Sequence, residues 1–394
     1  MGDAMITAER FYAGGKVVET LRRLRDASGG VLIAVCAVMI MLFPGETGQG
    51  ISDGIALCTQ RIVPSVFPMM IVCVLAVECG FAARAGRYLA PLSRRLFGLP
   101  GEGATAIFLS MIGGYPAGAR TVVELYENGS VTRAQAAHMA LFCFCSGPAF
   151  LIGVIGGLTG SAAAGWILMG VQAVVVVLMG VIVCRGAMGE SDADDGSKCR
   201  NRQAAAEKPL TEAVVSSVSK SASAVLQVCL YVMIFSAVNA VFERMGADTA
   251  VEHMIVRLGF SERIAGAIMP AVLEVTSGCI HSLDAGLPMT AFAVGFGGMS
   301  VHLQVLAITE RLGVNKGLFF LMRIVQGAMS ALLTWVVLGL VPDGGAIAAS
   351  AQLTSPGLSG SPQGAVVLVV MCAVYVLCVP VREGRILPET RKIR

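Results

Sequence analysis

The chain has 394 residues, of which 55% are hydrophobic and 14% are charged, and its mean hydropathy is +0.75. This composition excludes an ordinary soluble domain, and several uncharged stretches are long enough, at about 18 or more residues, to cross a hydrocarbon core. The net charge of +3 is carried by the predicted loops and gives no indication of nucleic-acid binding. We therefore expect an all-α protein that crosses the lipid bilayer several times.

Apolar runs, taken in chain order, predict about eight membrane-spanning helices. They lie near residues 31–45, 62–82, 135–157, 163–184, 222–242, 287–309, 317–340 and 364–381. Two further segments, about 103–121 and 263–282, are apolar but interrupted by Gly, Pro, hydroxyl or carboxylate groups. Each is long enough to enter a bilayer and return but poorly suited to a single crossing, so we predict two re-entrant hairpins.

Lys and Arg residues gather in both tails, in the loop after the second predicted span and in the loop at 185–212, whereas 341–363 has none. Eight spans with two re-entrant hairpins place every basic region on one side, which the positive-inside rule assigns to the cytoplasm. Full crossings at the interrupted segments would put basic loops on both sides. The predicted order is a cytoplasmic tail, a first half, a cytoplasmic linker, a second half and a cytoplasmic tail, at residues 1–30, 31–184, 185–212, 213–381 and 382–394.

Three predicted spans separate the two interrupted segments, so the first enters from the cytoplasm and the second from outside. Two similar units inserted in opposite senses form an inverted two-fold repeat. One register of the repeat pairs Ser110 with Glu274, and another matches residues 104–107 with 265–268. The order and composition of the elements carry this prediction, and its register is open by about one helical turn.

The tips of the interrupted segments, and the Gly/Ser-bearing segments that follow them, are the predicted binding site. Backbone that leaves helical geometry inside a bilayer frees N–H groups, which at a helix N-terminus can bind an anion or a polar solute. A cytosolic turn between two buried halves is the alternative for the first tip. The candidate binding residues are Ser110, Gly113, Gly114, Tyr115, Ser146, Gly147, Glu274, Thr276, Ser277, Gly278, Ser300, His302 and Gln304.

Glu274 is the sharpest single candidate, because a carboxylate within an apolar run is costly and usually faces a cavity or a partner. Substrate hydrogen bonding, ion ligation and proton relay all stay open, as does a neutral buried carboxyl that ties two helices together. His302 fits a packing histidine as well as a site residue. Helix packing explains the small residues near Ser146 and Ser300 equally well. Arg323, inside a predicted span, could pair with a carboxylate of the site or snorkel to the cytoplasmic face, and we expect snorkelling.

Motifs of common enzyme classes do not occur: there is no HExxH, GxSxG, P-loop or dinucleotide-binding pattern. The cysteines lie mostly in apolar runs and form no CxxC pair. We therefore predict no catalysis, no metal site and no cofactor, and leave open a coupling ion, H⁺ or Na⁺.

Five runs carry a resemblance to a known family: RIVPSVFPMMIV at 61–72, SMIGGYPAGAR at 110–120, CSGPAFLIG at 145–153, LEVTSG at 273–278 and FGGMSVHLQV at 296–305. Together they resemble the YlbJ-type sporulation integral membrane proteins, which belong with the nucleoside recognition, or Gate-domain, proteins. Glycine replaces the usual serine of the first unit's [S/G]GYP pattern. The resemblance implies a bacterial inner-membrane protein, in the forespore or mother-cell membrane, with two Gate repeats and a core like that of concentrative nucleoside transporters.

We therefore predict a transporter-like protein that moves a small polar solute, nucleoside-like by the resemblance. The alternative is a non-transporting scaffold for spore cortex or coat assembly, with a protein partner; a homo-oligomer is open in either case. For a transporter, Glu274→Gln and Gly114→Leu are expected to abolish uptake or spore maturation without lowering membrane abundance. For a scaffold, deletion of most of 188–210 should do more harm than Glu274→Gln.

Overall fold

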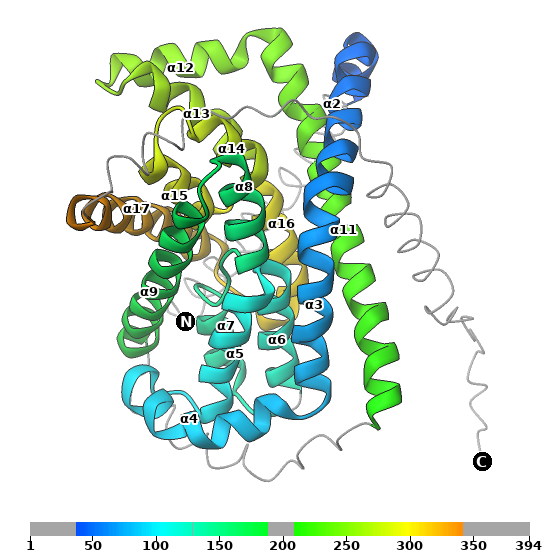
Figure 1. Ribbon diagram of the computed structural model, residues 1–394, viewed down its shortest axis with the longest axis vertical. Helices are drawn as coiled ribbons and strands as arrows, with labels where there is room; N and C mark the ends of the chain where they lie inside the picture. The colour runs from blue at the N-terminus through cyan, green and yellow to red at the C-terminus, as the bar shows by residue number, and fades with distance from the viewer. Residues whose placement is uncertain (1–36, 128, 188–208, 342–394) are drawn as a thin grey trace, which may run out of the picture.

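A computed structural model describes residues 37–127, 129–187 and 209–341, and within these ranges all regular structure is helical (Figure 1). The predicted last span, both predicted tails and most of the predicted linker lie outside the described residues. Four helices are long and apolar enough to cross a membrane, at Ala162–Arg185, Leu210–Met245, Leu287–Ile308 and Lys316–Leu340. They match four of the predicted spans, and the described residues confirm an all-α protein with several candidate membrane spans. The count of eight stays a prediction.

The outer surface of these helices carries large apolar side chains. Trp166 and Ile182 are exposed on one helix, and Leu321, Leu332 and Trp335 are exposed on another. Exposed apolar surface of this extent is unusual for a soluble monomer and is expected for helices that face lipid.

The first half begins with a long continuous helical rod. It consists of α2 (Pro44–Leu57), the π-helical turn η1 (Cys58–Ile62) and α3 (Val63–Glu78). The predicted end of the first span at residue 45 and the predicted limits of the second at 62–82 are therefore wrong, because a new helix starts at Pro44 and includes a polar run, and Gly80, at φ 69°, ends the rod by turning the chain. The predicted start at residue 31 lies outside the described residues. The apolar part of α3, Val66–Ala76, is shorter than a full span.

The rod packs against α11 (Leu210–Met245) through two glycines, four residues apart, on one face of α2. A Cβ atom at Gly50 would lie 2.6 Å from the Cα atom of Ala237, and one at Gly54 would lie 2.8 Å from the Cα atom of Met233. This close approach of two backbones is the role that small residues at this spacing have in membrane helix pairs.

Ion pairs tie both ends of this helix pair together. At one end Glu46 lies 3.1 Å from Arg244, and at the other Glu78 lies 2.5 Å from Lys220. The same lysine lies 3.3 Å from Glu124, so the second contact also joins the rod to the first interrupted segment.

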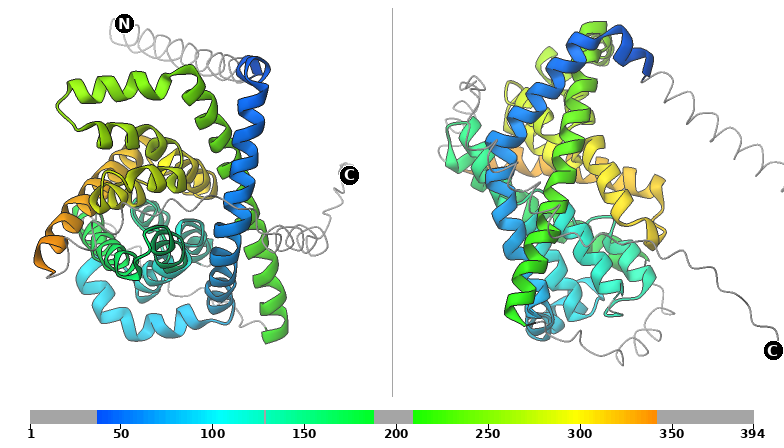
Figure 2. Two further views of the ribbon diagram at one scale, coloured as in Figure 1. Left: turned by 45° about the horizontal axis from the view of Figure 1, so that its top comes forward. Right: turned by 90° about the vertical axis from the view of Figure 1, so that its right-hand side faces the viewer.

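The two halves repeat one order of elements: a long helix, a crosswise helix, two short helices and a broken helix. In the first half, the crosswise and short helices are α4 (Phe81–Phe97), α5 (Gly101–Gly113) and α6 (Tyr115–Glu127). In the second half they are α12 (Ala247–Arg257), α13 (Glu262–Leu273) and α14 (Val275–Ser282). Figure 1 shows α4 and α12 at opposite ends of the molecule, and Figure 2 shows each crosswise helix leading into its pair of short helices. The inverted repeat requires this arrangement, and its orientation in a membrane stays a prediction.

Both predicted hairpins are helix pairs that double back at a single residue. A Cβ atom at Gly118 would overlap the side chain of Ser110, and one at Gly278 would overlap the backbone of Ala271. Residues seven or eight positions apart in a straight helix are separated by about 10–12 Å, so the chain must reverse between them.

The hydrogen bonds around the two reversals match. The amide of Gly114 donates to the carbonyl of Ser110, as that of Glu274 does to Pro270, and each reversal residue then accepts from the amide four residues later. The structure therefore pairs Gly114 with Glu274. This pairing differs by about one helical turn from the register that pairs Ser110 with Glu274, and by one residue from the register that matches 104–107 with 265–268.

Each hairpin is followed by a broken helix. In the second half, α15 (Leu287–Phe296) and α16 (Gly298–Ile308) meet at Gly297 within one candidate span. In the first half the break is longer, and the predicted single span 135–157 is wrong. The chain forms α7 (Arg133–Met139), an irregular stretch at 140–148, the π-helix η2 (Ala149–Ile155) and the short α8 (Gly156–Leu158). Pro148 is one physical reason, because it has no amide hydrogen for the carbonyl of Phe144.

The helices α9 (Ala162–Ala187) and α17 (Lys316–Leu340), with the 3₁₀ turn η3 (Glu310–Leu312) before α17, complete the described fold. One buried apolar cluster joins the two halves, and Phe142, Phe144 and Phe319 are among its largest fully buried side chains. The two halves therefore share one core.

Candidate functional site: a cavity between the two halves

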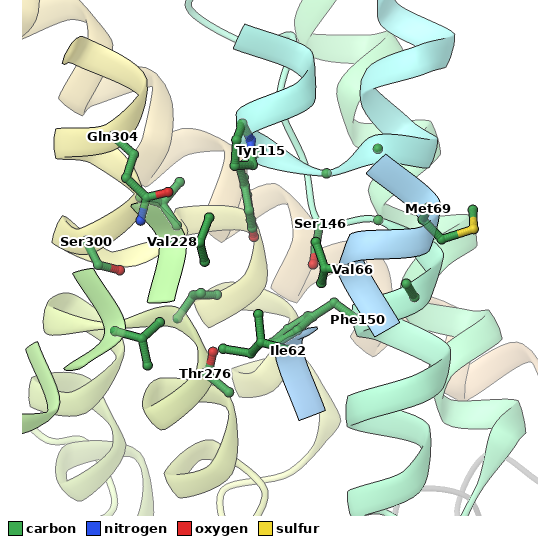
Figure 3. Close-up of a pocket in the computed structure, with 18 of the residues that line it drawn as sticks. Ile62, Val66, Met69, Tyr115, Ser146, Phe150, Val228, Thr276, Ser300 and Gln304 are labelled. Carbon is green, nitrogen blue, oxygen red and sulfur yellow. The ribbon is translucent and has the colours of Figure 1, made fainter. Parts of the chain in front are cut away.

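A cavity of about 70 Å³ lies where both hairpin tips and both broken helices meet (Figure 3). One water molecule needs about 10–15 Å³ of such space, so the cavity has room for about five. Nine of the thirteen predicted binding residues line it, namely Gly113, Gly114, Tyr115, Ser146, Gly147, Glu274, Thr276, Ser300 and Gln304. The remaining four are Ser110, Ser277, Gly278 and His302. The two interrupted segments, far apart in the sequence, thus line one cavity.

The first tip turns at Gly114, whose backbone has φ +83° and ψ −175°. This conformation is essentially restricted to glycine, because a Cβ atom would clash with the residue's own backbone. Tyr115 follows and starts α6, and its hydroxyl donates a 2.5 Å hydrogen bond to the carbonyl of Val294 in the other half. Gly147, from the break in the first broken helix, packs against this tip, since a Cβ atom there would lie 3.2 Å from the amide nitrogen of Gly114.

The second tip turns at Glu274, which is extended at φ −147° and ψ 134° and caps α14. Its Oε2 accepts a 2.7 Å hydrogen bond from the amide of Ser277, and its Oε1 accepts a 3.1 Å hydrogen bond from the hydroxyl of Thr276. A carboxylate at a helix N-terminus is stabilised by the free amides and by the helix dipole. The side chain is 1% exposed, and both of these partners belong to its own hairpin.

Ser300 and Gln304 are the polar side chains of the cavity with the fewest hydrogen bonds to other described residues. They are four residues apart on α16, so they share one helix face, and both are buried. The hydroxyl of Ser300 has no hydrogen-bond partner among the described residues. Figure 3 shows Ser300 and Gln304 on one side of the cavity and Ser146 and Phe150 on the other. A buried hydroxyl without a partner is costly, and a hydrogen bond to a bound molecule or water would remove this cost.

The four predicted residues outside the cavity have structural contacts. The hydroxyl of Ser110 donates to the carbonyl of Ile107 at 2.7 Å, Ser277 contributes its amide to the cap of α14, and Gly278 allows the close contact inside the second hairpin. His302 is fully buried, with its Nε2 atom 2.7 Å from the carbonyl of Phe296 and its ring against three aromatic rings. This is the environment of a packing histidine.

Arg323 does not snorkel to the membrane surface, so that expectation is wrong. It is 1% exposed, and its guanidinium donates to the carbonyls of Phe144, at 3.3 Å, and Leu141, at 2.5 Å. Its Cζ atom also lies 4.8 Å from the centre of the Phe144 ring. The break at 140–148 frees carbonyls that a continuous helix would use in its own hydrogen bonds. These carbonyls accept from the guanidinium inside the protein, so Arg323 does not need to reach water at the membrane surface.

The apolar wall of the cavity was not predicted. It includes side chains of η1, α3, η2 and α11, namely Ile62, Val66, Met69, Phe150, Val228 and Val232. Nothing in their pattern distinguishes them from lipid-facing residues of the same helices. Within the described part of the chain, no three His, Cys, Asp or Glu side chains lie close enough together to hold a metal ion.

Comparison with known proteins gives two matches. Residues 59–162 match the sequence model of the Gate family, described as nucleoside recognition. This region contains the first hairpin and the first break and leaves out the second hairpin. The chain is also 22% identical, over 316 residues, to the sporulation integral membrane protein YlbJ of Bacillus subtilis (strain 168), covering 74% of this chain and 78% of that protein. No solved structure matches the chain. The chain is therefore similar over most of its length to a sporulation integral membrane protein, and its residues 59–162 resemble the Gate family.

Proposed function

We propose that the cavity binds a small polar solute and that the protein moves this solute across the membrane. The observation that carries the proposal is the convergence of two oppositely placed hairpin tips on one cavity, with a buried hydroxyl, Ser300, that has no partner among the described residues in its lining. Discontinuous helices that meet at mid-membrane are the usual construction of a transporter binding site.

Space for several water molecules suits a small polar solute. Movement of the first hairpin tip away from the opposite half would break the hydrogen bond between Tyr115 and Val294. That bond is short and buried, and it joins the halves directly at the cavity.

The proposal predicts that a bound solute depends on Ser300 and Gln304. Purified protein is heated with uridine, adenosine, a peptidoglycan precursor, dipicolinate or a metal salt, and the melting temperature is recorded. We expect at least one of the organic solutes to raise it in the wild type and to lose this effect in the Ser300→Val/Gln304→Leu double variant, since both substitutions remove hydrogen-bonding groups. Val is larger than Ser by one heavy atom, and the control variant carries the same increase.

The matched control is Ser330→Val/Gln326→Leu, which changes the same residue types at fully buried positions that do not line the cavity. It should keep the solute-induced shift. Absence of a shift with every solute, or its loss only in the control, would exclude the cavity as the binding site. In that case the scaffold alternative gains support if deletion of 188–208 abolishes sporulation while the cavity variant sporulates normally.

A further inference from the structure

The crosswise helix α4 has two different faces. Toward the protein it presents Gly86, Ser93 and Phe97, all of which are buried. Away from the protein it presents four arginines and two large apolar or aromatic side chains, namely Arg84, Arg87, Arg94, Arg95, Tyr88 and Leu92. Tyr88 is 87% exposed and Leu92 is 51% exposed. Its sequence contains no Asp or Glu.

The helix is held at a fixed angle to its neighbours. It meets α5 at 91°, and the hydroxyl of Ser93 donates a 2.7 Å hydrogen bond to the carbonyl of Pro100 in the turn between them. At Gly86 a Cβ atom would lie 3.0 Å from the amide of Glu102, and at Gly180 of α9 one would lie 2.9 Å from the Phe97 ring. If α5 runs into the bilayer, α4 must lie along its surface. Figure 1 shows α4 across the end of the molecule where α9 also ends.

Three of the four arginines on the outer face carry positive charge that no carboxylate of the described residues neutralises. Arg87, Arg94 and Arg95 form no ion pair with a carboxylate of the described residues. Arg185, at the end of α9, adds a further positive charge, because its guanidinium donates a 2.5 Å hydrogen bond to the carbonyl of Arg95. Several guanidiniums therefore gather at one edge of the molecule.

We infer that the outer face of α4 binds anionic phospholipid headgroups at the membrane surface. On a helical wheel the four arginines form one stripe, with Tyr88 and Leu92 along its flank, so the helix can place its charges at phosphate level and its apolar side chains toward the acyl chains. Guanidinium groups bind phosphate well, and an aromatic ring with a hydroxyl suits the interface. Charge and location together favour a lipid over a soluble anion.

The test compares phosphatidylglycerol with phosphatidylcholine as additives to the full chain in detergent. Apparent lipid affinity is obtained from the melting temperature as lipid is titrated. We expect phosphatidylglycerol to stabilise the wild type more than phosphatidylcholine does. The Arg87→Gln/Arg94→Gln/Arg95→Gln variant should bind phosphatidylglycerol roughly 100-fold more weakly, because each basic residue near an anionic surface contributes about a factor of five. High salt should weaken the wild-type preference.

The control variant is Arg257→Gln/Arg263→Gln/Lys316→Gln, which removes the same number of positive charges from exposed positions away from α4. It should keep the preference for phosphatidylglycerol. Equal melting temperatures of both variants in phosphatidylcholine show that each has folded. The inference is overturned if the α4 variant keeps the preference, if the control loses it equally, or if inorganic phosphate reproduces the stabilisation.

Discussion

At the scale of single residues, Gly114 and Glu274 occupy equivalent positions in the two hairpins and reverse the chain in different ways. Each ends one short helix and begins the next at a reversal of the chain. Gly114 does so with a backbone conformation that other residues adopt only under strain, whereas Glu274 uses ordinary extended backbone and supplies its own cap. The first position therefore depends on a missing side chain and the second on a carboxylate.

Gly114→Ala is expected to destabilise the protein by about 1–3 kcal/mol, which is the usual cost of holding a non-glycine residue in such a conformation. Space is not the reason, because a Cβ atom at Gly114 would lie 3.6 Å from its nearest neighbour, an ordinary contact. The measurement is a thermal melt together with membrane abundance. Gly170→Ala, in open space on α9, is the control and should be neutral or stabilising.

The strained backbone at Gly114 also changes what we expect of Gly114→Leu, for which the sequence predicted loss of function at normal membrane abundance. Leucine would suffer the same backbone strain as alanine, so the membrane abundance of the Gly114→Leu variant should fall as well. A wild-type melting temperature for Gly114→Ala would contradict the strained geometry of the first tip.

At the scale of elements, the break in the first broken helix is stabilised from another helix. Pro148 cannot donate to the carbonyl of Phe144, and Arg323 on α17 donates to it instead. Sequence alone indicated a Gly/Ser/Pro-rich segment here and a charge inside a later span, but it gave no sign that the two meet. Because α17 packs against the break, the buried guanidinium of Arg323 can donate to the free carbonyls there, and these hydrogen bonds offset the cost of burying its charge.

Arg323→Met should therefore lower stability by about 1–3 kcal/mol for each carbonyl it leaves without a donor. Arg323→Lys should recover only part of this, because an ammonium group lacks the planar fork that contacts two carbonyls and stacks on an aromatic ring. Thermal melts of both variants test this, with Arg311→Lys as the control, since Arg311 is a largely exposed partner of Glu127. The assignment fails if Arg323→Met melts with the wild type.

At the scale of the whole molecule, each half donates hydrogen bonds to backbone carbonyls at the broken helix of the other half. Arg323 in the second half binds the carbonyls freed in the first, and Tyr115 in the first half binds the carbonyl of Val294, just before the break in the second. The halves are therefore joined through their irregular backbone, and that same region surrounds the cavity. A relative motion of the halves would change these contacts first.

The sequence predicted the parts of this architecture that follow from local chemistry. Interrupted apolar runs located both hairpins, and a carboxylate in such a run located the second tip at Glu274. The apolar boundaries were less informative, because the polar start of α2 is helical and the apolar run at 135–157 is not one helix. Contacts between distant segments, such as Tyr115 with Val294, depend on tertiary packing that composition and periodicity do not encode.

The most direct test of the central claim is uptake by proteoliposomes of whichever solute stabilises the purified protein. Radiolabelled solute should accumulate by counterflow in vesicles that contain the wild type or the Ser330→Val/Gln326→Leu control. It should fall to the level of empty vesicles with Ser300→Val/Gln304→Leu at equal reconstitution. Uptake by the cavity variant at the wild-type rate would contradict the account, as would wild-type vesicles that bind the solute and never accumulate it.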